Sequence, residues 1–460
     1  MRDILRGEKR MSELLARIEQ RNAVVGVIGL GYVGLPLAVA FAQAGFQVIG
    51  FDVDSERVTA LNKGISPIQD VSSWTLQQVV QTTFQATSDF SRLAEVDTVS
   101  ICVPTPLQKT KEPDISYVVN ATKHIANNLH PGQLVVLEST TYPGTTEELL
   151  QPMLEKTGLR VGRDFFLAFS PERIDPGNTQ FSLQNTPKVV GGTTEQCTQL
   201  AVALYSTIVE QVVQVGSTKV AELVKLLENT YRSVNIGLAN EFAQIADILG
   251  VDIWEVIEAA SSKPFGFVPF YPGPGLGGHC IPLDPYYLSW KLRSLHYRAR
   301  FIDVANEVNE EMPGFVVNQV ALALNEHGKC LKGSRILILG VAYKRDINDV
   351  RESPAIDVIE QLHEQHAHVT YADQYVPELR LHHTTLQSQP LSEALLQAVD
   401  CVVIVTNHST VDYAWVVEHS PLVIDTRNAT GHIEGAEHVW RLTRPTSVQA
   451  AEEQGVLLAS

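Results

Sequence analysis

Residues 23–54, AVVGVIGLGYVGLPLAVAFAQAGFQVIGFDVD, place a glycine-rich turn between an apolar strand and an apolar helix. Gly29, Gly31 and Gly34 occupy the G-x-G-x-x-G positions, which permit a tight turn, close approach of backbone to a pyrophosphate, and packing of helix on strand. Asp52 ends the next strand, at the distance of roughly 20 residues where a carboxylate accepts from adenosine ribose hydroxyls. The pattern predicts a dinucleotide-binding βαβ unit.

The acidic residue also indicates which dinucleotide binds. Asp52 favours NAD over NADP because its charge would repel a 2′-phosphate. Arg57 lies close by and is the residue type that accommodates such a phosphate, so NADP stays open as an alternative. We expect NAD as the cofactor.

Three further strand-like runs, residues 97–106, 132–140 and 164–172, alternate with helical stretches, as in a doubly wound parallel sheet. Ligands of such sheets bind at the carboxyl ends of the strands. The polar residues that end these runs are therefore candidates for the site, with ordinary helix capping as the alternative. They are Thr105, Ser139, Thr140 and Glu172.

Residues 217–250 contain no proline and have apolar residues at helical spacing, which predicts a long helix. Lys225 and Asn229 are four apart on it, so that they either point together at one oxygen or form a solvated face. A second α/β sheet begins within residues 333–362, without a G-x-G-x-x-G turn. Its first turn contains cations that suit a phosphate or form a surface cluster, namely Lys344, Arg345 and Arg351.

The segment GPGLGGHCIPLDP, residues 273–285, puts Cys280 directly after a loop too rich in Gly and Pro for a stable helix or strand. A buried small hydrophobe is one interpretation, and a thiol left reachable beside a ligand is another. His279 and Asp284 suggest a metal site, but without a paired CxxC or HxxxH elsewhere we expect no metal.

Length and charge limit the remaining possibilities. The chain has 460 residues, enough for two or three domains, and its net charge of −17 argues against nucleic acid or an anionic membrane as the main partner. Residues 1–22 read as an amphipathic surface helix rather than a signal peptide, and we find no apolar run that predicts a membrane span. The cysteine usage suits a reducing cytoplasm.

The whole chain, from about Val24 to Arg427, resembles the nucleotide-sugar 6-dehydrogenases, the UDP-glucose and UDP-N-acetylhexosamine dehydrogenase family. The motifs are GLGYVGLPLA, EST, FSPER, KLLENT, GGHCIPLDP and GVAYKRDINDVRES. The resemblance implies two Rossmann-like doubly wound domains joined by a long central helix, in a homodimer or higher oligomer. We expect an N-terminal helix (1–22), an NAD-binding domain (23–216), a central dimerisation region with the cysteine loop (217–328) and a UDP-binding domain (329–460).

The resemblance also implies a mechanism with two oxidations. The alcohol at C6 of the sugar loses a hydride to NAD, and the Cys280 thiolate captures the aldehyde. The thiohemiacetal loses a second hydride to a second NAD, and water releases the carboxylate from the thioester. Lys225 and Asn229 would stabilise the oxyanion. Asp284 and Thr140 would hold the water, with Glu172 as general base.

Binding residues follow from the same resemblance. The contacts to NAD would come from Gly29, Gly31, Tyr32, Val33, Gly34, Asp52, Arg57, Thr105, Thr140 and Arg351. The contacts to the UDP-sugar would come from Glu172, Arg173, Lys225, Asn229, Tyr271, Gly273, Gly275, Gly277, Lys344 and Arg427.

One position departs from the family pattern. UDP-glucose dehydrogenases have a second glutamate four residues after the first, where this chain has Pro176, with Asp175 as a candidate replacement. The segments around FSPER and Cys280 resemble the bacterial branch that acts on UDP-N-acetylglucosamine for surface polysaccharide synthesis. The alternatives are UDP-glucose or another UDP-hexosamine as substrate, a single-step epimerase or reductase, and a nucleotide-sugar-binding protein without activity.

Overall fold

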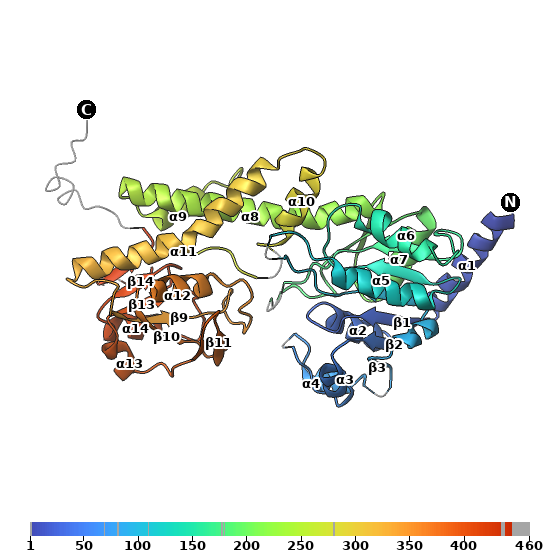
Figure 1. Cartoon of the computed structure of the whole chain (residues 1–460), viewed down its shortest axis with the longest axis horizontal. Helices are drawn as coiled ribbons and strands as arrows, with labels where there is room; N and C mark the ends of the chain where they lie inside the picture. Colours follow the sequence, from blue (N-terminus) through green and yellow to red (C-terminus); the bar gives the residue numbers. More distant parts are fainter. Residues whose placement is uncertain are drawn as a thin grey trace. The chain divides into compact units, whose positions relative to one another are not determined.

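The computed structural model describes residues 2–68, 70–80, 82–108, 110–175, 178, 180–278, 281–433 and 438–443. The chain forms two compact units (Figure 1). Unit 1 comprises Met1–Glu228 and Tyr286–Arg298, and unit 2 comprises Asn229–Pro285 and Ala299–Ser460. Two helices cross the boundaries between them, α8 (Thr218–Leu249) and α10 (Asp284–Arg293). The domain limits expected from the sequence stay a proposal.

Unit 1 contains an eight-stranded sheet in the order β3-β2-β1-β4-β5-β6-β7-β8. Its strands are β1 (Val24–Ile28), β2 (Gln47–Phe51), β3 (Phe84–Thr87), β4 (Thr98–Ile101), β5 (Leu134–Leu137), β6 (Phe166–Phe169), β7 (Lys188–Gly192) and β8 (Val212–Gln214). Its helices are α1 (Arg2–Glu19), α2 (Gly34–Gln43), α3 (Ser55–Asn62), α4 (Ser73–Gln77), η1 (Phe90–Glu95), α5 (Ser116–Asn128), η2 (Thr146–Leu150), α6 (Gln151–Glu155) and α7 (Glu195–Tyr205).

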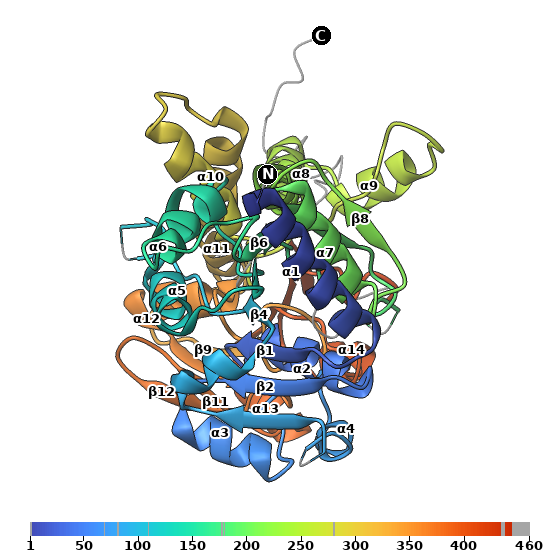
Figure 2. The same ribbon diagram turned by 90° about the vertical axis from the view of Figure 1, so that its right-hand side faces the viewer.

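Both faces of this sheet are covered, because its apolar strands alternate their side chains between two cores. Val25 and Val27 belong to the core shared with α1, α2 and α7, whereas Ile28 belongs to the core shared with α5 and α6. Figure 2 shows α1 beside α7, which it contacts. Ile28 pairs with both Phe51 and Ile101, so the first strands end at the same level and their loops share one edge.

The last two strands depart from the parallel sheet predicted from the sequence. The first six strands of the order, from β3 through β6, are all parallel to their neighbours. β7 instead runs antiparallel to β6, and β8 runs parallel to β7. The described residues between β6 and β7 contain no helix, so the chain returns without the crossover that a parallel strand needs.

Unit 2 contains a second parallel sheet in the order β10-β9-β13-β14-β15. Its strands are β9 (Arg335–Leu339), β10 (His368–Ala372), β13 (Cys401–Ile404), β14 (Val423–Asp425) and β15 (Val439–Arg441), with the hairpin β11 (Glu378–Arg380) and β12 (Thr385–Gln387). Helices α11 (Arg300–Glu326) and α12 (Pro354–Glu364) share one core with it, and α13 (Glu393–Ala398) and α14 (Tyr413–His419) share the other. α9 (Ile253–Ser261) also contributes to the first core.

The fold class expected from the sequence is confirmed: two doubly wound α/β sheets and a long central helix. Within the described residues, no helix combines the length and apolar character that crossing a membrane requires.

Candidate functional site

The turn between β1 and α2 is shaped by its glycines. Gly29 has φ +90°, and a Cβ added at Gly34 would lie 1.8 Å from the Gly29 carbonyl oxygen. Gly31 instead borders open space, where an added Cβ would meet no heavy atom within 4 Å. α2 begins after Val33 without a side-chain cap or an acidic residue in its first turn, and Tyr32 is partly exposed in the same turn. Uncapped N–H groups beside open space fit the pyrophosphate of NAD.

Asp52 follows β2 and is oriented by the backbone around this turn. Its carboxylate accepts the N–H of Leu30 at 2.9 Å and that of Asp54 at 3.0 Å, and it is only 6% exposed. Arg57 Nη1 donates to the same carboxylate at 3.1 Å. Asp52, which we expect to select NAD, is therefore ion-paired with Arg57, the residue type that would admit NADP. The carboxylate still has lone pairs that can accept hydrogen bonds from a ribose.

Candidate residues also gather where β4 and β5 end side by side. Ser139 donates to the Val103 carbonyl at 2.8 Å, and Thr140 follows it, partly exposed. The Thr105 carbonyl accepts the Tyr287 hydroxyl at 2.7 Å, which ties this loop to α10. The structure thus brings Thr105, Ser139 and Thr140 to one edge of the sheet, as the sequence predicts.

Glu172 and Lys225 form a buried pair. Glu172 follows β6, accepts the Ile174 N–H, and has its Oε2 at 3.7 Å from Lys225 Nζ on α8. The two residues are 7% and 5% exposed. Away from water their charges interact far more strongly than on a solvated face, so the solvated alternative for Lys225 is wrong.

Asn229 lies one turn after Lys225 on α8 and is also buried. Its Nδ2 donates to a carboxylate oxygen of Asp284, the first residue of α10. α8 therefore places a buried ammonium and a buried amide one turn apart, each held by a carboxylate. That arrangement supplies two hydrogen-bond donors of the kind that stabilise an oxyanion.

The glycine loop of residues 271–278 packs against other candidate residues of unit 2. A Cβ at Gly273 would lie 2.5 Å from Nη1 of Arg427, and a Cβ at Gly277 would lie 2.5 Å from the Cβ of Tyr343. Gly275 has φ +129°, which a residue with a side chain rarely adopts. Burial lowers the pKa of Arg427 to about 10, against the attraction of Asp425, so it stays charged at neutral pH. Backbone N–H groups and a guanidinium at close range suit a diphosphate.

The remaining cations of this region are held by the loop after β9. Lys344 is partly buried there, next to Tyr343. Arg351 donates to both oxygens of Asp349 at 2.9 and 3.0 Å, and its predicted contact with NAD stays a prediction. Tyr271 stacks on Trp254 with the ring centroids 6.1 Å apart.

Arg173, expected to contact the substrate, forms an ion pair with Glu228 at 2.6 Å in unit 1. His279, Cys280 and Pro176 lie outside the described residues. Among the residues that the structure does describe, no group of three or more His, Cys, Asp or Glu side chains could hold a metal ion.

Two buried groups beside the site were not predicted from the sequence. Glu222, one turn before Lys225, accepts the N–H and hydroxyl of Thr146 at 2.9 and 2.7 Å. Burial raises the pKa of Glu222 to about 7, although these hydrogen bonds and that from Gly144 oppose the shift. Its spacing of three from Lys225 on one helix was the available signal.

The other missed group is an ion pair beneath the ends of the strands. Lys188 Nζ lies 2.7 Å from Glu138 Oε2, both less than 6% exposed, and Tyr205 donates its hydroxyl to the same carboxylate. Glu138 directly precedes Ser139 and Thr140, so this network anchors the loop that holds them. The partners come from β7 and α7, which no local pattern connects to Glu138.

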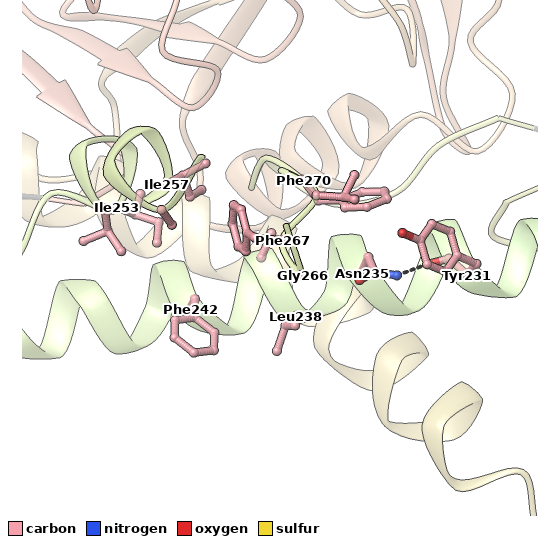
Figure 3. Close-up of a pocket in the computed structure, with 13 residues that line it drawn as sticks. Tyr231, Asn235, Leu238, Phe242, Ile253, Ile257, Gly266, Phe267 and Phe270 are labelled. Atoms are coloured by element: carbon pink, nitrogen blue, oxygen red, sulfur yellow. Dashed lines mark hydrogen bonds between the residues drawn. The ribbon is translucent and has the colours of Figure 1, made fainter. Parts of the chain in front are cut away.

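Unit 2 also contains an apolar pocket of about 490 Å³ between α8, α9 and residues 266–270 (Figure 3). Leu238 and Phe242 project from α8, Ile253 and Ile257 from α9, and Phe267 from the loop. None of its lining residues is charged, and none supplies a nucleophile. The pocket therefore lacks the chemistry of the polar candidates described above.

A dinucleotide turn on one α/β unit and a diphosphate-suited loop on another are typical of a two-domain dehydrogenase that uses NAD. The sequence matches the NAD binding domain (residues 23–209), central domain (219–311) and UDP binding domain (337–432) of the UDP-glucose/GDP-mannose dehydrogenase family. The chain belongs to this family and is an NAD-dependent UDP-sugar dehydrogenase.

The names of the similar proteins specify three different sugars. The chain is 38% identical over 358 residues to a UDP-N-acetyl-D-glucosamine 6-dehydrogenase of Pseudomonas aeruginosa. The aligned region covers 77% of this chain and 84% of that protein. The structure resembles a UDP-D-ManNAc dehydrogenase of Pyrococcus horikoshii (TM-score 0.84, 34% identity, covering 92% and 99%). It also resembles an NDP-N-acetyl-D-galactosaminuronic acid dehydrogenase of Methanosarcina mazei (TM-score 0.79, 31% identity, covering 95% and 98%).

Proposed function

We propose that this enzyme oxidises the C6 hydroxyl of a UDP-N-acetylhexosamine to the uronic acid, with UDP-N-acetylglucosamine as the preferred substrate. The names of the relatives and the sequence around Cys280 support a hexosamine. The observation that best supports an oxidation at C6 is that Lys225 and Asn229 lie one turn apart on α8, each buried against a carboxylate. We further propose that the enzyme is cytoplasmic and that its product serves surface polysaccharide synthesis.

In this mechanism NAD, when bound, accepts the hydride in each of the two oxidations. The Cys280 thiolate attacks the aldehyde carbon, so that the carbonyl oxygen becomes an oxyanion and takes a proton to give the thiohemiacetal. Lys225 and Asn229 donate hydrogen bonds to that oxygen. After the second oxidation, water adds to the thioester with Glu172 as base, and the thiolate leaves.

The partners of the other carboxylates support the roles that we propose for them. Asp284 orients Asn229 and, with Thr140, would hold the water. Glu172 is oriented by Lys225 and by the Ile174 N–H. These residues belong to the described part of the chain, which is interrupted at Pro176. Asp175 remains the alternative base.

The direct test incubates the enzyme with NAD and a panel of UDP-sugars. We expect two NADH per sugar oxidised and the highest kcat/KM with UDP-N-acetylglucosamine. One NADH per sugar or none would indicate a single-step reductase or epimerase, and a binding protein would give none. A higher kcat/KM for UDP-glucose would contradict the hexosamine assignment alone.

The nucleophile has its own test in Cys280→Ser. A hydroxyl has a much higher pKa than a thiol, so steady-state NADH production should fall by several orders of magnitude. NAD and UDP-sugar binding, measured by calorimetry, should stay within about twofold because the change is nearly isosteric. Near-normal formation of the uronic acid would contradict the assignment.

We also propose a homodimer formed through α8. Five apolar side chains at spacings of seven, four, three and four residues form an apolar stripe on this helix, and each is at least 40% exposed. The apolar stripe consists of Tyr231, Leu238, Phe242, Ile245 and Leu249. Exposed apolar surface at heptad-like spacing is typical of a helix that packs against a second helix.

A further inference from the structure

The sheets of the two units share one arrangement around their first βα turns. β10-β9-β13-β14 repeats the order β2-β1-β4-β5, and every pair is parallel. Gly29 and Gly340 both have positive φ, +90° and +80°, and their N–H groups bond to the last residue of the neighbouring strand at 2.8 and 3.0 Å. The residue that follows that neighbouring strand is an aspartate in both cases. Asp373 of unit 2 is therefore the counterpart of Asp52.

The two aspartates also make the same backbone contacts. Each accepts one N–H from the residue after the glycine and one from the residue two positions beyond itself. These distances are 2.9 and 3.0 Å for Asp52, and 2.8 and 2.8 Å for Asp373. Both carboxylates therefore hold the first turn of their sheet against the second strand.

The units differ in the side chain that reaches the remaining side of the carboxylate. In unit 1 this is Arg57, whose side chain is 37% exposed. In unit 2 it is His408, whose side chain is 2% exposed and whose Nε2 lies 3.0 Å from Asp373 Oδ2. Tyr375 covers the imidazole, with the ring centroids 4.9 Å apart. In unit 2, protein side chains thus occupy the surroundings that we assign to the NAD ribose in unit 1.

The origin of His408 in the chain supports this equivalence. Ile404 pairs with the last residue of β9, and Ile101 pairs with the last residue of β1. His408 comes four residues after Ile404, and Thr105 comes four residues after Ile101. His408 therefore takes the place of Thr105, the residue that we expect to contact NAD in unit 1.

The second imidazole nitrogen binds the loop that contains Lys344. His408 Nδ1 accepts the N–H of Asp346 at 2.9 Å, so the proton of the neutral ring lies on Nε2 and is donated to Asp373. Asp346 has φ +63° and accepts the Ser409 N–H at 2.8 Å. His408 thus connects the end of β10 to a constrained backbone position two residues after Lys344.

We propose that His408 is a positioning residue for UDP: by bridging Asp373 and Asp346 it holds the loop of residues 340–346 so that Lys344 meets the diphosphate. This inference rests on the proposed role of Lys344 in UDP binding. His408 acts through the loop and does not touch the reacting atoms. Its effect is therefore on the affinity for UDP and the UDP-sugar, and not on NAD or the chemical step.

The test compares wild type with His408→Ala and with His408→Gln, which keeps one donor and one acceptor. We expect His408→Ala to raise the UDP Kd, measured by calorimetry, and the KM for the UDP-sugar by at least about tenfold, the effect of losing one strong hydrogen bond. The KM for NAD and kcat should stay within about twofold. Added imidazole should restore UDP affinity in His408→Ala, and His408→Gln should retain part of it.

His438→Ala is the matched control. Its imidazole too has a partner within hydrogen-bonding distance, the backbone carbonyl of Val417 at 2.8 Å from Nε2, but it lies next to β15 at the opposite edge of the sheet from β10. Its UDP Kd should equal that of wild type. A wild-type UDP Kd in both His408 variants would overturn the proposal, as would an equal rise in the KM for NAD.

The outcome separates this inference from the proposed function. UDP calorimetry needs no turnover, so it decides the role of His408 even if wild type oxidises no UDP-sugar in the panel. If His408→Ala does not fold, the UDP Kd of His408→Gln decides: a rise with an unchanged KM for NAD supports the role, and a wild-type value overturns it.

Discussion

At the scale of single residues, Lys225 has the environment of a group that acts on developing charge. Its ammonium is buried beside Glu172, so its charge is already desolvated before any substrate charge forms. Lys225→Met keeps the length of the side chain and removes the charge. We expect kcat to fall by about 10²- to 10³-fold with little change in KM, as measured by steady-state kinetics.

Lys219→Met provides the comparison on the same helix. Lys219 is half exposed and pairs with Glu147 and Glu148 at 3.7 and 3.6 Å, so its loss should leave kcat near wild type. If Lys225→Met instead raised KM and left kcat unchanged, Lys225 would be a ground-state binding residue.

Asp52 provides the second prediction at this scale. Its buried carboxylate should give wild type a preference for NAD over NADP of at least about tenfold in kcat/KM, equal to about 1.4 kcal/mol. Asp52→Asn should narrow the ratio because Arg57 then faces the 2′-phosphate alone. Asp54→Asn is the control, since it removes a neighbouring charge and keeps a residue that caps α3. A wild-type ratio near one would contradict this role of Asp52.

At the scale of elements, Glu222 connects α8 to the turn before η2. Because burial raises its pKa to about 7, the folded protein binds this proton more tightly than the unfolded chain does between about pH 4.5 and 7. Stability from this group is therefore greatest at low pH and falls as pH rises through 7, by about 3 kcal/mol at most.

Glu222→Gln should remove this pH dependence. The difference in Tm, variant minus wild type, should shift in favour of the variant between pH 5 and pH 8, measured by thermal unfolding. Glu241→Gln, an exposed glutamate on α8, should give the same difference at both pH values. A constant difference for Glu222→Gln would show that this carboxyl titrates alike in both states.

At the scale of the whole molecule, the proposed dimer depends on the apolar stripe of α8. Phe242→Glu puts a charge at the middle of the stripe, where burial against a second copy would desolvate it without a partner. We expect light scattering to report about twice the chain mass for wild type and the chain mass for Phe242→Glu. Glu241→Ala, outside the stripe, should retain the wild-type mass. A monomeric wild type would contradict the dimer.

The sequence by itself determined the two α/β sheets, the long helix predicted within residues 217–250 and the dinucleotide turn. These depend on local physics: the alternation of apolar residues, the spacing of glycines that must accept positive φ or close contact, and a carboxylate at the end of the next strand. For the same reason the sequence predicted that Lys225 and Asn229 share one face of a helix, but it did not predict which residues they contact.

Tertiary structure alone decided which groups those residues meet. Glu172 comes to Lys225, Lys188 to Glu138 and His408 to Asp373 across 53, 50 and 35 residues of sequence. The reversal of β7 likewise depends on how the chain returns to the sheet, not on the composition of the strand. Burial and hydrogen bonding between distant segments are set by the packing of whole elements, and no local spacing encodes them.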